Sequence, residues 1–178
     1  MTASAPRAAY AFRTRWWVAA EPARCWQELE RVATGRAASW WRGLRVAVPA
    51  PALEPPARVG LVVRAPLGYL LRVDLVVTHA APGREAAARS TGDLDGRGRV
   101  ALRPCRGGTE LVFVWDVEVR RAWMRAASPL LRPLFRAAHA VVMRAGERGL
   151  RRALAHRRSE GRKPVNPRPG AEGSGADR

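Results

Sequence analysis

The chain has few of the residues that build metal centres and disulfide frameworks. Its 178 residues include two cysteines, Cys25 and Cys105, and neither belongs to a CxxC motif or a Cys/His cluster. The three histidines, His79, His139 and His156, are far apart in the sequence. Disulfide-rich domains and zinc sites need several such residues at short spacings. We therefore expect neither kind of site, and no motif for a cofactor is present.

Long apolar runs are also missing. No stretch of about 18 apolar residues occurs, so the sequence predicts no membrane-spanning helix. Residues 1–10 lack the apolar core of a secretory signal. These two absences favour a soluble, cytoplasmic protein.

Acidic residues and lysine are scarce beside arginine. Of 32 basic residues, 31 are arginine and Lys163 is the one lysine, and the formal net charge is +17. Residues 120–158 hold eleven arginines and one acid, Glu147. Such a run is most often a solvated face, and weak contact with an anionic membrane surface is the alternative. We do not expect nucleic acid as a partner, because RNP-like, helix-turn-helix and zinc patterns are absent.

The apolar periodicity predicts strands that follow a short helical region. Residues 10–18 alternate in polarity, which is typical of a strand with one buried face. Pro22 opens a short helix that ends at Gly35, and a second short helix or turn follows it. Asp95-Gly96 and Gly107-Gly108 are hairpin signals. The further strand-like runs are 44–48, 58–65, 69–78, 85–94, 99–103 and 109–119.

The last part of the chain has the period of a helix. Ser128-Pro129 predicts an N-cap and the first helical residue, although a short helical segment containing Trp123 could precede them, and Pro133 should bend the first turns. We expect an α+β domain over residues 9–156, with residues 1–8 as a disordered lead-in and 157–178 as a disordered basic tail. In this domain a curved antiparallel sheet of about six or seven strands wraps around the long C-terminal helix, and two short helices follow the first strand.

Several motifs follow each other from the first strand to the last helix. They are the strand 12–18 with Glu21-Pro22 and Cys25-Trp26, Trp40-Trp41-Arg42-Gly43, the 92–96 hairpin, Gly108-Thr109-Glu110-Leu111 with Trp115, and the helix run 139–150. In the order and spacing of these motifs, over roughly residues 10 to 155, the sequence resembles the START-like (SRPBCC) superfamily, also described as the polyketide cyclase/dehydrase and lipid-transport group or the Bet v 1-like fold. The helix run is similar to bacterial members of unassigned function.

This resemblance implies a helix-grip fold with a deep cavity for apolar or amphipathic ligands, but it implies no particular chemistry. From the strand phasing we expect apolar side chains of the sheet and of the helix to face each other across this cavity. Core packing is the alternative for each of them. These candidates are Trp16, Leu71, Val73, Leu75 and Trp115 from the sheet and Leu131, Phe135 and Val142 from the helix.

His139 is the one polar candidate for the cavity wall. It could anchor a ligand by a hydrogen bond or act as a general base, while a structural histidine at the edge of the core is the favoured alternative. Asp93 could be a buried acid, although an Asp beside Gly before a hairpin is more often part of the turn.

Three functions remain open. The first is a non-catalytic carrier of a hydrophobic small molecule, either a lipid or a polyketide-like compound. The second is an enzyme of the polyketide cyclase, aromatase or dehydratase type, with His139 as its weak catalytic candidate. The third is an interaction module that binds an anionic membrane or nucleic acid through the basic helix.

Overall fold

Seven strands form a single antiparallel sheet in the order β1-β7-β6-β5-β4-β3-β2. The computed structural model describes residues 9–66, 68–120 and 122–160, and within these it omits the side chains of 122–131 and 160. Successive strands from β2 to β7 pair with each other as a meander, and β1 then pairs with β7. The strands are β1 (Ala9–Val18), β2 (Leu44–Val48), β3 (Arg58–Arg64), β4 (Leu70–Ala81), β5 (Glu85–Gly92), β6 (Leu94–Cys105) and β7 (Gly108–Val119).

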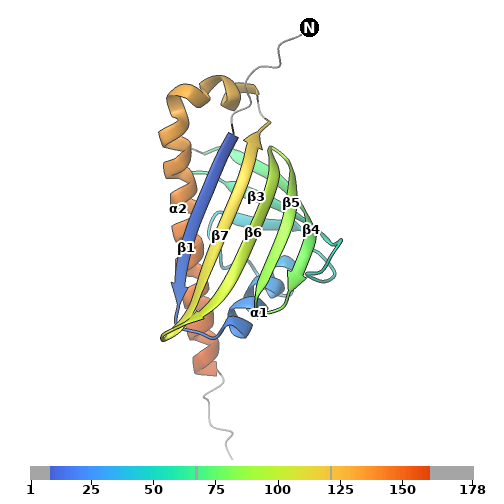
Figure 1. The fold of residues 1–178 in the computed structure, drawn as a ribbon, viewed down its shortest axis with the longest axis vertical. Helices are drawn as coiled ribbons and strands as arrows, with labels where there is room; N and C mark the ends of the chain where they lie inside the picture. Colours follow the sequence, from blue (N-terminus) through green and yellow to red (C-terminus); the bar gives the residue numbers. More distant parts are fainter. Residues whose placement is uncertain (1–8, 67, 121, 161–178) are drawn as a thin grey trace, which may run out of the picture.

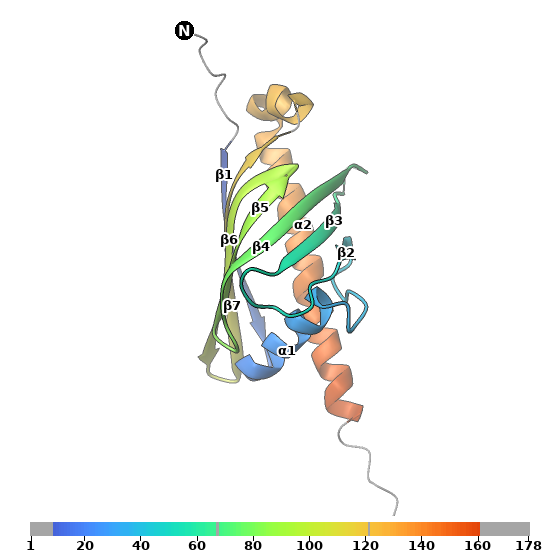
Figure 2. The same ribbon diagram turned by 90° about the vertical axis from the view of Figure 1, so that its right-hand side faces the viewer.

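Within the described residues two helices accompany the sheet, α1 (Pro22–Ala33) and α2 (Ala122–Glu160). The sheet is strongly curved, and α2 runs along its concave side with α1 packed near the end of the strands (Figures 1 and 2). A curved sheet with one long helix in its grip buries the apolar faces of both elements. The predicted α+β helix-grip architecture is confirmed.

The prediction of two short helices after the first strand is wrong in one respect, because only α1 forms. Gly35 follows α1 with a φ of +70°, a conformation that favours glycine and ends the helix. The chain then makes turns instead of a second helix. The Ser39 hydroxyl accepts a hydrogen bond from the Trp41 amide, a local pairing that competes with helix formation.

The C-terminal helix is longer than its sequence signals predict. It begins at Ala122 and passes through Ser128-Pro129, so the predicted N-cap at Ser128 is wrong. Its first turns bend away from the axis of the rest of the helix (Figure 1), as expected for a segment that holds Pro129 and Pro133. The helix ends at Glu160, and Arg157, which the sequence placed in the tail, pairs with the buried Glu28 of α1.

The hairpin expected at Asp95-Gly96 lies two residues earlier. Strand β6 begins at Leu94 and includes Gly96. Asp93 forms the turn, and its carboxylate accepts a hydrogen bond from the Arg72 amide at 2.8 Å while its own amide donates to the Arg72 carbonyl at 2.9 Å. Asp93 therefore fastens the β5–β6 turn to β4, and the turn interpretation of this residue holds.

The packed core is divided into two clusters. One, here called the tryptophan cluster, contains Trp16, Trp26, Leu111, Met143 and Leu150 among its members. The other, here called the Tyr10 cluster, is built from Tyr10, Leu71, Val73, Val117, Val119 and Phe135. Along α2, Phe135 belongs to one cluster and Met143 to the other, so the two clusters are about two turns of helix apart.

Glycine in α2 allows the turn before β2 to pack directly on the helix. A Cβ atom added to Gly149 would lie 2.1 Å from the carbonyl oxygen of Trp40, and one on Gly146 would lie 2.4 Å from the indole of Trp41. The Trp41 indole N–H donates to the carbonyl of Val142 at 2.8 Å. The turn that holds Trp40 and Trp41 is therefore clamped to the helix backbone.

This close packing predicts whether a glycine-to-alanine substitution in α2 raises or lowers the stability of the protein. In an unconstrained helix, replacing glycine by alanine raises stability by about 1 kcal/mol. We expect Gly149→Ala instead to lower the free energy of unfolding by about 1–3 kcal/mol, because the new methyl group collides with backbone. Urea unfolding measures the difference, and Ala155→Gly at an exposed position of the same helix provides the propensity scale. A more stable Gly149→Ala protein would contradict the clamp.

Candidate ligand-binding site

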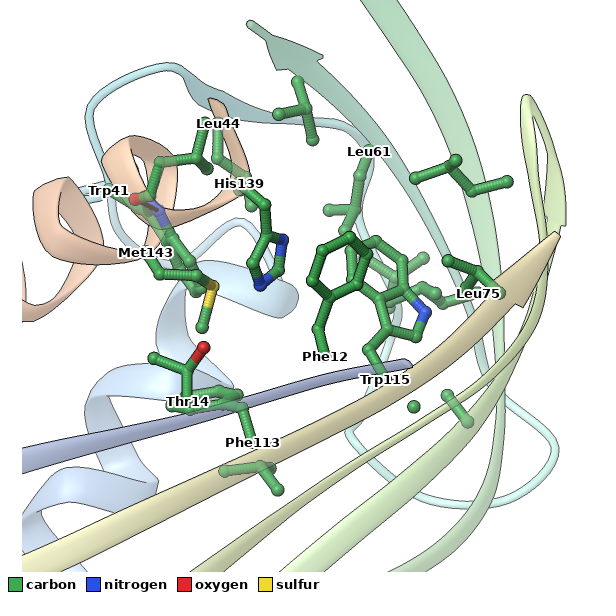
Figure 3. A pocket seen from close by; sticks show the side chains of 18 of the residues that line it. Phe12, Thr14, Trp41, Leu44, Leu61, Leu75, Phe113, Trp115, His139 and Met143 are labelled. Atoms are coloured by element: carbon green, nitrogen blue, oxygen red, sulfur yellow. Dashed lines mark hydrogen bonds between the residues drawn. The ribbon is translucent and has the colours of Figure 1, made fainter. Parts of the chain in front are cut away.

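A cavity of about 350 Å³ lies between the concave face of the sheet and α2. Side chains from both core clusters border it, and the residues between the clusters form its middle. Small-molecule sites in proteins usually begin at this size. Figure 3 shows the part of the cavity around Phe12, Trp115 and His139.

The wall has an aromatic part and an aliphatic part. Strand registers place Phe12 opposite Trp115 and Thr14 opposite Phe113, so β1 and β7 together present a band of rings. The pairing of β3 with β4 sets Leu61 opposite Val73 and Val63 opposite Leu71. The aliphatic side chains that line the cavity include Val59, Leu61, Val63, Leu71, Leu75, Val77, Ala86 and Ala88.

His139 projects from α2 into the middle of this cavity (Figure 3). Its ring stacks on Phe12 with 3.9 Å between centroids and 21° between planes, and Trp115 lies 6.4 Å away at a tilt. Burial lowers the pKa of His139 from 6.5 to about 4, because the charged imidazolium loses its hydration. The side chain is therefore a neutral imidazole at pH 7.

Charged groups are absent from the cavity as far as the described residues show. Its lining contains no Asp, Glu or Lys, and Arg99 is the one arginine. The guanidinium of Arg99 lies on the other face of the sheet, where it pairs with Glu85 at 2.9 Å. The remaining polar side chains of the lining are Tyr10, Thr14, Tyr69, His139 and the indoles of Trp26, Trp40, Trp41 and Trp115.

The structure places six of the nine candidate residues at the cavity wall. Two others, Trp16 and Val73, point to the concave side but are 1 % and 0 % exposed, because neighbouring side chains in the two clusters cover them completely. Leu131 lies outside the residues whose side chains are described. The six that border the cavity are Leu71, Leu75, Trp115, Phe135, His139 and Val142.

Several lining residues were not among the candidates. Phe12, Thr14 and Phe113 belong to the same alternating faces as Trp16 and Trp115, so the sequence signal for them was present. Trp41 had no such signal, because it lies in a turn and reaches the cavity only through its packing on α2. Leu29 and Val32 of α1 close the cavity at the end where α1 packs.

Comparison with known proteins gives the fold but no family. No family model matches the chain, and no curated protein matches it either. Among solved structures, TTHA0849 from Thermus thermophilus is similar with a TM-score of 0.62 and 20 % identity, covering 83 % of this chain and 99 % of that one. Protein Ms6760 from Mycobacterium smegmatis has a TM-score of 0.60 and 14 % identity, covering 83 % and 92 % of the two chains.

A third similar structure is a protein with a named role. StfQ, a di-domain ARO/CYC protein of the steffimycin biosynthetic pathway, matches with a TM-score of 0.57 and 18 % identity. The match covers 85 % of this chain and 52 % of StfQ, about the length of one of its two domains. At these identities the three structures establish a shared helix-grip fold.

Two further findings concern the described part of the chain alone. None of its helices combines the length and the apolar character that crossing a bilayer requires. Nor do three or more His, Cys, Asp or Glu side chains gather there at a spacing that could hold a metal ion.

The lowered pKa of His139 predicts a loss of stability in mild acid. In the unfolded chain a histidine has a pKa near 6.5, whereas in the folded protein that of His139 is about 4. As the pH falls from 6.5 to 4 the unfolded state takes up a proton that the folded state does not, so the free energy of unfolding decreases.

We expect His139→Phe to lose less stability than the parent protein between pH 7 and pH 5. Urea midpoints at both pH values measure the two losses, and the comparison cancels the contributions of all other titrating groups. Equal losses in both proteins would show that His139 is not protected from protonation.

Proposed function

We propose that this protein belongs to the START-like superfamily and binds a hydrophobic small molecule, a lipid or a polyketide-like compound, between the sheet and α2. The observation that carries the proposal is a cavity of about 350 Å³ with an almost entirely apolar wall. Such a cavity binds by burial of apolar surface, and few polar groups remain to orient the ligand. The order of sequence motifs supports the same assignment.

Carriage is favoured over catalysis by the chemistry of the wall. A cyclase or dehydratase needs at least one group that moves a proton, often a base and an acid together. Among the described lining residues His139 is the one imidazole, and no carboxylate lies beside it to orient or activate it. The ARO/CYC role of StfQ supports polyketide-like compounds as ligands. If cyclisation does occur here, it would depend on His139, and His139→Ala would abolish it.

Ligand binding is tested with the neutral dye Nile red and a variant that fills the cavity. Leu75 of β4 points into the cavity, so Leu75→Trp should weaken Nile red binding at least ~10-fold by occupying the space. Leu70→Trp places the same ring on the exposed face of the same strand and should leave the affinity unchanged. Dye binding by neither the parent protein nor Leu70→Trp would refute the proposal.

The ligand itself is identified from protein purified from its own host. Mass spectrometry after denaturing extraction should find an apolar compound that is retained by the parent protein and depleted from Leu75→Trp. Its structure decides between the lipid and the polyketide class. A compound retained equally by both proteins would lie outside the cavity.

A second function, contact with an anionic membrane surface, is favoured by the charges of α2. Arg144, Arg148 and Arg152 are exposed and follow each other at intervals of four residues. Within the described part of the chain they form no ion pair, whereas Arg151 pairs with Glu147 at 2.7 Å. Like charges at this spacing repel each other on a helix. An anionic surface would relieve this repulsion.

The membrane proposal predicts binding to vesicles that contain phosphatidylglycerol and none to pure phosphatidylcholine. Replacing Arg144, Arg148 and Arg152 by Gln should reduce binding ~10-fold or more, at about 1 kcal/mol for each arginine near the surface. Flotation of the protein with vesicles measures this, and about 0.5 M salt should release it.

The matched control replaces Arg89, Arg97 and Arg103, three exposed arginines of the sheet, by Gln and removes the same charge. Equal losses in both triple variants would show that net charge, not the α2 surface, is responsible. Tighter binding to duplex DNA than to these vesicles would favour nucleic acid instead.

A further inference from the structure

We propose that the cavity selects an electrically neutral ligand whose hydroxyl or carbonyl group forms a hydrogen bond with His139, and this inference rests on the proposed function. An amphipathic lipid anion and a neutral alcohol or ketone are both hydrophobic, so apolar burial alone does not distinguish them. The distribution of charge and of open hydrogen-bonding groups around the cavity does.

Among the described residues, a bound anion would find no counter-charge in the cavity. The guanidinium of Arg99 pairs with Glu85 outside the cavity. Arg64 of β3 and Arg72 of β4 are exposed and alternate with the inward-facing Val63 and Leu71. A carboxylate or phosphate in this cavity would lose its hydration without gaining an ion pair, which is strongly unfavourable.

His139 is the central polar group that a ligand can reach. No hydrogen bond to its ring nitrogens occurs within the described residues. As a neutral imidazole it offers one donor and one acceptor, which suits a hydroxyl and, through the donor, a carbonyl. Stacking on Phe12 holds the plane of the ring, so the hydrogen bond has a fixed direction.

Several other polar groups of the wall are less available. The Trp41 indole already donates to Val142, and the indole nitrogens of Trp40 and Trp115 are covered by neighbouring atoms. Tyr10 and Tyr69 each take part in a further interaction within the fold. Thr14 is more available, since it projects from β1 into the same part of the cavity as His139 (Figure 3).

The rings beside His139 favour a flat ligand near this polar point. Phe12 and Trp115 are cross-strand partners in the β1–β7 pair, and Phe113 lies two residues before Trp115. Aromatic side chains gathered in one part of a cavity wall favour contact with a planar ring system. The hydrogen-bonding group of the ligand is therefore expected on or next to a ring, with the rest of the molecule against the aliphatic wall.

Three naphthalene compounds test the inference because they share a ring system and differ in one group. At pH 7.5, 2-naphthol is neutral, 2-naphthoate is an anion and naphthalene has no hydrogen-bonding group. Displacement of Nile red should show that the parent protein binds 2-naphthol at least ~10-fold more tightly than 2-naphthoate, because the anion gains no counter-charge. Equal or tighter binding of the anion would overturn the inference.

His139→Phe keeps the ring and its contact with Phe12 but removes the hydrogen bond. In this variant the affinity for 2-naphthol should fall about fivefold, as expected for one neutral hydrogen bond, while the affinity for naphthalene stays the same. An unchanged affinity for 2-naphthol would remove His139 from the site.

Nile red binding distinguishes a failure of the proposed function from a failure of the inference about the ligand. If the parent protein does not bind the dye, the proposed function itself fails. If the dye binds but 2-naphthol does not displace it, the proposed function stands and the inference about the ligand fails.

Discussion

The contact between two tryptophans and the glycine backbone of α2 determines how the long helix lies in the sheet. Trp40 and Trp41 occupy space that only glycine leaves free at positions 146 and 149. The same residues bring Trp16 of β1 against the helix, at 4.9 Å from the Trp41 ring. This half of α2 is therefore fixed by close packing, and the tryptophan cluster is filled. About one and two helical turns from Gly146 toward the N-terminus, Val142 and His139 line the cavity instead.

The cavity lies along α2 between the tryptophan cluster and the Tyr10 cluster, where side chains do not fill the space. The Tyr10 cluster closes the other end, with Phe135 in edge-to-face contact with Tyr10 at 6.3 Å. Protein interiors normally fill such volumes, because apolar side chains that border an empty space lose dispersion contacts on that side. A ligand would supply those contacts, and its binding would stabilise the folded state by an amount that rises with the logarithm of its concentration above Kd. An apolar cavity kept between two well-packed clusters is thus a property of this architecture and not a local packing fault.

The sequence predicted which side of each strand faces the helix but not how deeply each residue is buried. Alternation alone puts Trp16, Trp115, Val73 and Leu75 on the concave face, and the structure places them there. Whether such a residue borders the cavity or is covered depends on neighbours that are distant in sequence, such as Gly146 beside Trp16. Long-range contacts of this kind leave no local pattern. The same limit explains the errors in the boundaries of elements, since the turn at Asp93 is set by hydrogen bonds to a different strand. Helix α2 likewise extends past its expected end because the Arg157 side chain meets the buried Glu28 of α1.

The net charge of the protein does not describe the chemistry of its cavity. With a formal charge of +17, composition points to anionic partners, yet the described lining presents no charged group to a ligand. Strand alternation accounts for this separation, because Arg13, Arg15 and Arg72 occupy the positions between inward-facing apolar residues. The excess of positive charge therefore describes only the outer surface. The interior must be judged by its own polar groups, and the stacked imidazole of His139 is the one at its centre.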